Sequence, residues 1–395
     1  MNHIDPVIPT GVVSRRTHVR TTSTKGDDNA MTTITNSLPA LKEYGREMGY
    51  DLGWLEASPS WGQRVEPGRG GLVLDDVEGA APEAPDESRN LTGRPRGTLA
   101  RSAVPRVGNY SVRTKADIWL RNAAELYEEA QQRQWSSATD IPWERVTALP
   151  DEIERAECQL ATFLTEVEFV AGDVPGRWIS SVTPDYFEPR MFLISQVMDE
   201  ARHLDVFRKR ALVNGGGLMQ RTAAAAAVTG GAIDSARDFS EMSARLHMSG
   251  EGSVLTLFRI GELMAYNDAE KQIYRLAAQD ESRHVAFGVM HLQYLAQAAP
   301  DRREEIQTYL DEAERNLVTG ASGQNPASTG APSSEALAVL LGHGVDNYDE
   351  GMRLLLAARQ RQVREYFQRV KVAGFGERFE NGRANKMLEQ YVNAA

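Results

Sequence analysis

Apolar residues recur at every third or fourth position through most of the chain after residue 114, whereas the alternation typical of strands is scarce. That spacing is typical of α-helices with one buried face. Glycine, proline and asparagine interrupt the pattern and divide it into separate helices. The long helices that we predict cover residues 116–134, 150–171, 190–214, 235–266, 269–299, 302–318 and 348–372. The sequence therefore predicts an all-α fold.

Other segments lack this pattern. Residues 1–40 are rich in threonine, serine, asparagine and arginine, and residues 56–108 carry many prolines, glycines and charges. Both compositions are typical of irregular chain. Residues 319–334 have the composition of a flexible linker. We expect three regions: a flexible, irregular N-terminal arm (1–110), a helical domain (111–318), and a linker with C-terminal helices packed on that domain (319–395).

Composition and charge narrow the possible functions. Apolar residues make up 41% of the 395 residues, enough for a sizeable core, and the formal net charge is −11. A strongly acidic surface repels nucleic acid and anionic membranes, so we expect neither as a partner. The single cysteine, Cys158, excludes an intramolecular disulfide and a zinc–thiolate cluster. The sequence shows neither an apolar run long enough to cross a bilayer nor a secretory signal, so we expect a cytoplasmic protein.

One five-residue phrase occurs twice in the helical region. DEARH, residues 199–203, reappears as DESRH, residues 280–284, with a change only at the middle position. Each copy contains Glu-x-x-His, and residues three apart on a helix lie one turn above each other on the same face. A carboxylate and an imidazole therefore point into the same small volume.

Both Glu-x-x-His pairs fall on otherwise apolar helix faces. Phe207 shares the face of Glu200 and His203, and Ala277 shares the face of the pair Glu281 and His284. A carboxylate buried there is strongly unfavourable without an opposite charge, which a metal ion supplies. Two-metal carboxylate bundles use two Glu-x-x-His helices and one further glutamate from each of two other helices. The phrase therefore predicts a ferritin-like four-helix bundle with additional helices.

Antiparallel geometry selects the glutamate of the third helix. The turn between the third and fourth helices centres near Asn267, and Glu281 lies fourteen residues after it. Glu251 lies sixteen residues before the turn, at a similar height. Glu262 lies only five residues before it and would miss that height by roughly 13 Å. We therefore expect Glu251 to be the ligand.

The first long helix offers Glu166 and Glu168. Two residues apart on a helix means about 200° of rotation, so at most one of them faces inward. Glu166 shares its stripe with Phe163 and Phe169, whereas Glu168 shares its stripe with Leu164 and an alanine. The periodicity does not separate them, and either completes a set of four glutamates and two histidines.

Further polar residues accompany the expected ligands. The aspartates and arginines of the two phrases either form surface ion pairs or lie behind the ligands and orient them, since a metal-bound histidine usually donates its second N–H to a carboxylate. Those four residues are Asp199, Arg202, Asp280 and Arg283. His247 and His291 fall roughly on inward stripes, where each is either an accessory to the ligands or a core histidine that is hydrogen-bonded.

This ligand set suits two iron ions, with manganese possible, because carboxylate and imidazole are the ligands that these metals take. A pair of Fe(II) ions can deliver the electrons that reduction of O2 needs. The apolar lining would exclude water and hold a small organic substrate. The glycine run 215–217 has no strand before it and reads as a helix stop, so we find no nucleotide motif. Electrons would come from a separate donor.

The doubled phrase resembles that of the catalytic subunits of bacterial multicomponent monooxygenases, and it is also similar to that of acyl-carrier-protein desaturases. The segment EVEFVAG, residues 166–172, resembles the first-ligand helix of the monooxygenases, in which the ligand glutamate stands six residues before a glycine. The resemblance covers residues 150–295 and implies Glu166 rather than Glu168 as the first ligand.

The resemblance implies a function. It implies a di-iron monooxygenase that inserts oxygen into a small organic substrate by C- or N-oxygenation, takes electrons from a ferredoxin or reductase, and forms a homodimer. The alternatives are a desaturase or other oxidase on the same site, or a ferroxidase or metal-storage protein. The iron ligands that it implies, including the four catalytic glutamates, are Glu166, Glu200, His203, Glu251, Glu281 and His284.

Two positions depart from the families that the chain resembles. Leu255 stands where the monooxygenases are expected to have an active-site threonine, although Thr256 is adjacent, so the details of proton delivery do not carry over. Phe207 stands four residues after the first histidine, where the radical-forming small subunit of ribonucleotide reductase carries a tyrosine. That difference argues against a tyrosyl-radical role.

Overall fold

The computed structural model describes residues 38–55, 62–99, 104–221, 231–321 and 332–393. The chain divides into two compact units, Met1–Ala57 and Ser58–Ala395. Within the first unit, the described residues form helix α1 (Leu38–Met48) and a short 3-10 helix (Gly53–Leu55). The predicted boundaries at residues 110 and 318 stay predictions.

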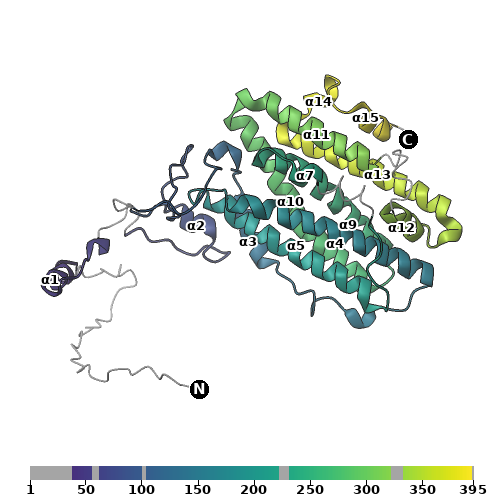
Figure 1. Ribbon diagram of the computed structural model, residues 1–395, viewed down its shortest axis with the longest axis horizontal. Helices are drawn as coiled ribbons and strands as arrows, with labels where there is room; N and C mark the ends of the chain where they lie inside the picture. Colours follow the sequence, from purple (N-terminus) through teal and green to yellow (C-terminus); the bar gives the residue numbers. More distant parts are fainter. Residues whose placement is uncertain (1–37, 56–61, 100–103, 222–230, 322–331, 394–395) are drawn as a thin grey trace, which may run out of the picture. The chain divides into compact units, whose positions relative to one another are not determined.

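The second unit is built on four long helical segments (Figure 1). Contacts pair α4 with α5, and α9 with α10. The third segment is composite, because α8 and a π-helix precede α9 without a break in the chain. The bounds are α4 Asp151–Ile179, α5 Phe187–Val213, α8 Phe239–Ser243, the π-helix Ala244–Glu251, α9 Gly252–Met264 and α10 Asp268–Ala298. These segments lie close to the predicted ranges.

Shorter and peripheral helices complete the second unit. Before the bundle come α2 (Leu74–Glu78), a 3-10 helix (Lys115–Asp117), α3 (Ala123–Gln132) and a second 3-10 helix (Trp143–Arg145). Between α5 and α8 lies α7 (Ala232–Asp234). After the bundle come α11 (Arg303–Ala321), α12 (Pro332–Leu341), α13 (Tyr348–Val370), a π-helix (Lys371–Phe375), α14 (Glu377–Glu380) and α15 (Lys386–Asn393), with 3-10 helices at Pro300–Arg302 and Val345–Asn347.

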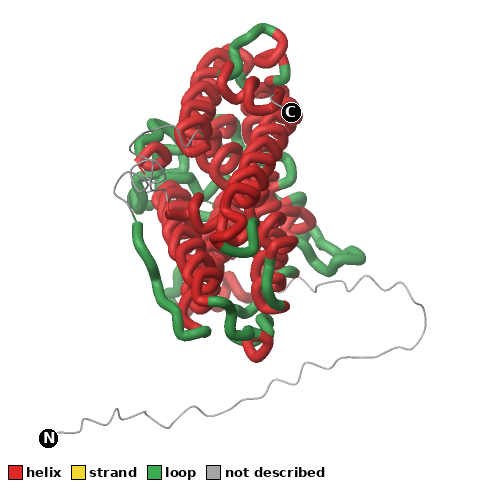
Figure 2. Tube along the Cα trace, turned by 90° about the vertical axis from the view of Figure 1, so that its right-hand side faces the viewer, coloured by secondary structure: helices red, strands yellow, loops and turns green. Residues whose placement is uncertain are grey.

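The described chain is helical, as the sequence predicts. Figure 2 shows helices joined by loops, and β-structure in the described ranges is limited to isolated bridges such as that between Val112 and Val182. None of the described helices is long and apolar enough to cross a membrane. The all-α prediction is confirmed.

Helix α4 is longer than predicted. We expected Gly172 and Pro175 to end it near residue 171, but the helix continues through both to Ile179. Gly172 faces α5 so closely that an added Cβ would lie 3.3 Å from the Cβ of Glu200. Pro175 is buried inside the helix. Packing against α5 therefore outweighs the local preference of these residues to stop a helix.

The irregular segment before α3 is anchored to the start of α5. Ser88 and Asn90 are buried, and both hydrogen-bond the carboxylate of Asp185, at 2.6 and 2.9 Å. Arg96 binds Glu188 in the first turn of α5, with a shortest N–O distance of 2.5 Å. Apart from α2 and the 3-10 helix Lys115–Asp117, the described residues of this segment are irregular, and polar contacts fix the segment to the bundle.

The C-terminal helices enlarge the hydrophobic core. Contacts place α11 against the π-helix and α13 against α9. Tyr309 from α11 and Tyr366 from α13 are buried in one cluster with Leu255 from α9. Each such buried side chain contributes roughly 1.5–3 kcal/mol to the free energy of unfolding. Figure 1 shows α11 and α13 on the same side of the bundle.

Candidate metal centre

Helices α5 and α10 bring the two copies of the repeated phrase face to face. Glu200 and His203 come from α5, and Glu281 and His284 come from α10. All four side chains are at most 1% exposed. The spacing of three residues places each carboxylate beside its own imidazole, as the sequence predicts.

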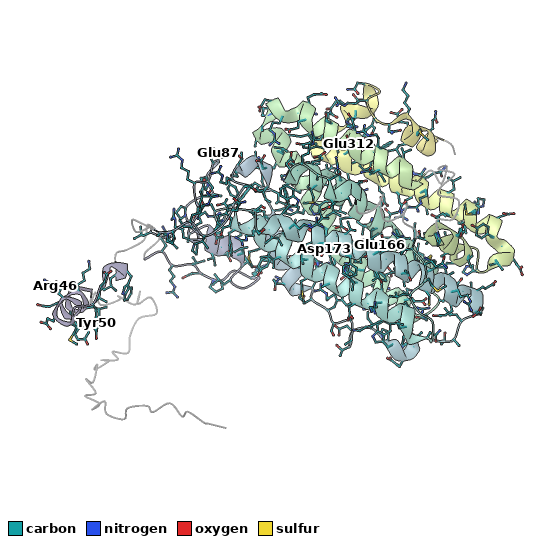
Figure 3. All side chains as sticks on the ribbon, viewed as in Figure 1. Arg46, Tyr50, Glu87, Glu166, Asp173 and Glu312 are labelled. Carbon is teal, nitrogen blue, oxygen red and sulfur yellow. The ribbon has the colours of Figure 1, made fainter. Side chains whose placement is uncertain are left out.

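Helix α4 contributes Glu168, not Glu166. Glu168 is buried, and its Oε2 lies 3.7 Å from Nδ1 of His203. Glu166 lies outside the cluster and forms an ion pair with Arg221. It and Asp173, two turns further along α4, are labelled in Figure 3. The structure therefore places Glu168, and not Glu166, among the candidate ligands.

The burial of its neighbours explains the orientation of α4. Phe169, which shares the stripe of Glu166, is 55% exposed, whereas Leu164 and Ala171, which share the stripe of Glu168, are buried. The apolar character of Phe169 made the outward stripe look like an inward one. Single exposed aromatic residues are common on protein surfaces, so they weaken any inference from periodicity alone.

Glu251 closes the cluster from the third segment. It is the last residue of the π-helix Ala244–Glu251. A π-helical turn holds more residues than an α-helical turn, which rotates the face that follows. Glu251 is buried beside Glu281 at the height that the antiparallel argument predicts. Glu262 lies elsewhere and pairs with Arg275 at 2.7 Å.

The ligand atoms form two adjacent groups that share two glutamates. In each group, one ligand atom per residue lies within 4.8 Å of the others, and these are the groups of this kind found among the described residues. The shared residues are Glu200 and Glu281. The first group is Glu168, Glu200, His203 and Glu281, and the second is Glu200, Glu251, Glu281 and His284.

The imidazoles present the same nitrogen to the centre. Nδ1 of His203 lies 3.3 Å from Glu200 and 3.3 Å from Glu281. Nδ1 of His284 lies 3.0 Å from Glu200 and 3.3 Å from Glu281. The two ring centroids are 6.4 Å apart. The lone pairs that a metal needs therefore converge on the space between α5 and α10.

The opposite nitrogens face aspartates. Nε2 of His203 lies 3.2 Å from Asp280, and Nε2 of His284 lies 3.3 Å from Asp199. Each histidine is thus held by the aspartate of the other helix. A carboxylate acceptor keeps the proton on Nε2 and frees Nδ1 for a metal.

Arg202 and Arg283 join these two aspartates in a ring of four charged side chains behind the histidines. Arg283 binds Asp280 at 2.5 Å and Asp199 at 3.0 Å. Arg202 binds Asp199 and lies 3.2 Å from Asp280. All four side chains are less than 10% exposed, so they are not surface ion pairs.

Trp135, just after α3, contacts this ring of charged side chains from outside. Its sequence position did not indicate this contact. Its Nε1 donates to Asp280 at 2.7 Å. The guanidinium of Arg202 lies over its ring, 5.4 Å from the centroid, and also donates to Gln134 at 2.7 Å. A tryptophan and a glutamine beside a short helix carry no periodic signal that points to a site 145 residues further along the chain.

The other candidate residues lie outside the cluster. His247 hydrogen-bonds Gln196 and Ser243, and burial lowers its pKa to about 3, so it is neutral. His291 contacts Ser240 at 3.0 Å. The Thr256 hydroxyl lies 2.6 Å from a carboxylate oxygen of α13. This threonine therefore points away from the candidate centre.

Burial and mutual repulsion perturb the acids. Burial raises the pKa of Glu168 well above its usual range, although the nearby imidazole of His203 acts in the opposite direction. Burial and the neighbouring charge of Glu281 likewise raise the pKa of Glu251. Burial opposes ionisation of Glu200 as well, but the adjacent His284 holds the pKa of Glu200 below its usual value. Without a metal, Glu168 and Glu251 therefore hold a proton more readily than an ordinary glutamate does.

The pKa values of the two imidazoles at the centre are raised as well. Burial alone would lower the pKa of His203 and His284, but contacts with the surrounding carboxylates raise both well above their usual value. In the metal-free chain, protons thus supply the positive charge at the centre. Metal ions that bind here would displace those protons.

Several polar atoms at the centre have no hydrogen-bond partner among the described residues. Buried polar atoms are almost always hydrogen-bonded, so a group of orphaned acceptors facing one point is unusual. These atoms are Glu168 Oε1, Glu200 Oε1 and Oε2, Glu281 Oε1 and His203 Nδ1. Cations that bind carboxylate and imidazole would satisfy all of them. The residues present therefore fit a pair of metal ions.

Aromatic rings seal this polar centre. The ring centroid of Phe258 lies 6.2 Å from that of His203, and Phe192 lies 6.3 Å from His284. Phe207, at the position of the radical tyrosine in reductase subunits, packs against Phe258 at 5.4 Å. These rings are apolar and the centre is buried, which strengthens electrostatic interactions inside it.

No protein-family model matches the sequence, and no curated protein matches it. Among solved structures, the chain is similar to an R2-like ligand-binding oxidase with an aerobically reconstituted metal cofactor after photoconversion. The identity is 16%, the match covers 65% of this chain and 95% of that one, and the TM-score is 0.51. An R2-like ligand-binding oxidase with an aerobically reconstituted Mn/Fe cofactor shows 17% identity over 61% and 91% of the chains, with a TM-score of 0.47. At this identity, the first likeness supports the ferritin-like fold alone.

Proposed function

We propose that this protein is a two-metal oxidoreductase that activates O2. The observation that carries the proposal is the set of orphaned carboxylate and imidazole atoms that converge between α5 and α10. Iron or manganese suits this donor set. The ligands that we propose are Glu168, Glu200, His203, Glu251, Glu281 and His284.

When bound, a reduced metal pair supplies the electrons for O2 reduction. The protein supplies the arrangement around it. Glu200 and Glu281 belong to both ligand groups, so each would help to hold both ions. Asp199 and Asp280 hold the histidines in the tautomer that leaves Nδ1 free. The phenylalanine rings exclude water, which protects reactive species from side reactions.

The reaction that we favour is monooxygenation of a small organic substrate, by C- or N-oxygenation. The phenylalanine rings beside the centre suit an apolar substrate, and the doubled phrase resembles that of the monooxygenases. We find no nucleotide-binding motif in the sequence, so we propose an external electron donor, a ferredoxin or reductase. We propose a homodimer by the same resemblance.

A desaturase or other oxidase on the same site is the alternative within enzymes. The name of the similar structure, an R2-like ligand-binding oxidase, supports that alternative. A ferroxidase or storage protein is the alternative from another class, because it would use the same ligands to oxidise iron and then take up more.

Rapid-mixing absorbance spectroscopy tests the proposal. The metal-free protein is loaded with two equivalents of Fe(II) without oxygen and then mixed with O2. We expect O2-dependent oxidation of the bound iron, seen as a visible absorbance change that ends in a stable spectrum, with no uptake beyond two ions. Continued uptake of added iron would favour storage, and no binding at all would refute the metal centre. Glu200→Ala and His284→Ala are expected to abolish the response.

A further inference from the structure

A row of buried hydrogen bonds runs from Glu251 away from the cluster. Gln196 on α5 donates from Nε2 to Oε1 of Glu251, at 3.1 Å. Its Oε1 lies 3.1 Å from Nε2 of His247. Nδ1 of His247 lies 2.9 Å from the hydroxyl oxygen of Ser243. Gln196, His247 and Ser243 are fully buried, so water does not compete for these bonds.

Only one arrangement of protons satisfies this row. As a metal ligand Glu251 would be ionised, and a carboxylate accepts hydrogen bonds but donates none, so the NH2 of Gln196 must face Glu251. Its carbonyl oxygen then faces His247 and requires a proton on Nε2. Nδ1 is left as an acceptor, and the Ser243 hydroxyl donates to it. Each member therefore fixes the orientation of the next.

Packing fixes the far end of the row as well. His247 lies against Gly288 on α10, where an added Cβ would overlap the Cβ of His247. The ring of Phe287 lies 5.3 Å from the imidazole, edge to face. The imidazole projects from the π-helix and is held by Gln196 of α5 and by α10, so it does not turn freely.

The corresponding glutamate of the other group lacks this support. Oε1 of Glu168 has no hydrogen-bond partner among the described residues, and its other oxygen faces His203. The two groups of the candidate centre are therefore symmetric in their ligands but not in what stands behind them.

We propose that Gln196 and His247 are positioning residues that hold the Glu251 carboxylate in one orientation. The metal affinity of the group that contains Glu251 and His284 then depends on them. This role rests on the metal centre proposed above. Partners that orient a metal ligand typically change metal affinity by about 10–100-fold when they are removed, so one of the two metal equivalents should be affected selectively.

Anaerobic titration with Co(II) tests this role, because the visible spectrum of Co(II) reports the ligands around each ion. Gln196→Met removes both hydrogen bonds with little change of volume. We expect the wild type to bind two equivalents of Co(II). In the variant, the affinity for one of these two ions should fall by about 10-fold or more, and its spectrum should change. His247→Phe should show the same selective loss. His247→Gln should restore affinity, because its amide N–H can reach the carbonyl of Gln196.

Gln362→Met is the matched control. Gln362 is also buried and donates from α13 to the backbone of Ser253 at 2.9 Å, without contact to the cluster. The Gln362→Met variant should bind both equivalents of Co(II) with wild-type affinity. Wild-type affinity and spectrum in Gln196→Met, or an equal loss of both equivalents in both methionine variants, would overturn the positioning role. If circular dichroism shows that Gln196→Met does not fold, the test rests on the two His247 variants: a selective loss in His247→Phe that His247→Gln restores would support the positioning role, and its absence would overturn it. A wild type that binds no Co(II) would instead overturn the metal centre itself.

Discussion

Glu166 and Glu168 are two residues apart on α4, yet only Glu168 faces the centre. Substitution of the two residues should therefore have different effects on metal binding. Glu168→Gln removes a proposed ligand from the group around His203. Glu166→Gln removes only a partially exposed ion pair with Arg221. The first should weaken metal binding, whereas the second should leave it intact.

The size of the effect follows from linkage. A metal at 100 times its Kd stabilises the native state by about 2.7 kcal/mol per site, and thus by about 5.4 kcal/mol for two independent sites. The unit Ser58–Ala395 has an unfolding entropy of about 0.7 kcal/mol/K, so metal should raise the wild-type Tm by about 8 °C if unfolding is two-state. If Glu168→Gln weakens its site about 100-fold, that site contributes only about 0.4 kcal/mol and the total shift falls to about 4 °C.

Scanning calorimetry with and without Mn(II), at the same free metal concentration for each variant, measures these shifts. Glu166→Gln should keep the wild-type shift. The metal-free form of Glu168→Gln should also melt no lower than the wild type near pH 7, because burial penalises the charge that the substitution removes. A halved shift in Glu166→Gln together with a full shift in Glu168→Gln would refute the orientation of α4.

Three further predictions concern buried residues of the bundle. Burial and the charge of Glu270 raise the pKa of Glu157 from 4.5 to about 8, so the folded state keeps a proton that the unfolded state loses, and stability falls as pH rises from about 4.5 towards 8. Glu157→Gln should therefore raise the free energy of unfolding in urea by a few kcal/mol near pH 8 and change it little near pH 4, where both states hold the proton. Arg210 binds Glu270 at 2.7 Å, so Arg210→Met should leave buried acids without their cation and lower the free energy of unfolding by about 3–5 kcal/mol at neutral pH, and an unchanged urea midpoint would contradict this. Gly288→Ala should cost about 1–3 kcal/mol by overlap with His247, measured as a lower Tm, with a surface glycine-to-alanine change as control.

The sequence predicts the bundle well because its strongest signals are local. Long helical periodicity and the spacing of three between Glu and His depend only on helix geometry, and both hold in α5 and α10. The partnership of Glu251 and Glu281 also follows from rise per residue and a single tight turn. These features need no knowledge of what packs against them.

The structural features that the sequence did not predict depend on tertiary contacts. The rotation of α4 that buries Glu168 is set by its neighbours, and an exposed Phe169 disguises it. The π-helix before Glu251 and the passage of α4 through Pro175 likewise reflect packing that outweighs local preference. Trp135 reaches the centre only because α3 docks on α5. Residue spacing carries no signal for any of these contacts.

The charge of the centre explains why divalent ions suit it. The ring of two aspartates and two arginines behind the histidines is neutral by itself, and each aspartate holds the histidine of the other helix, so the ring forms only when α5 and α10 dock. The four glutamates are left to be balanced from within. Two neutral imidazoles supply no charge, and two divalent ions supply four positive charges. Folding therefore assembles a site whose remaining charge matches such a pair, and without metal the chain reaches balance only by holding protons on glutamates and imidazoles.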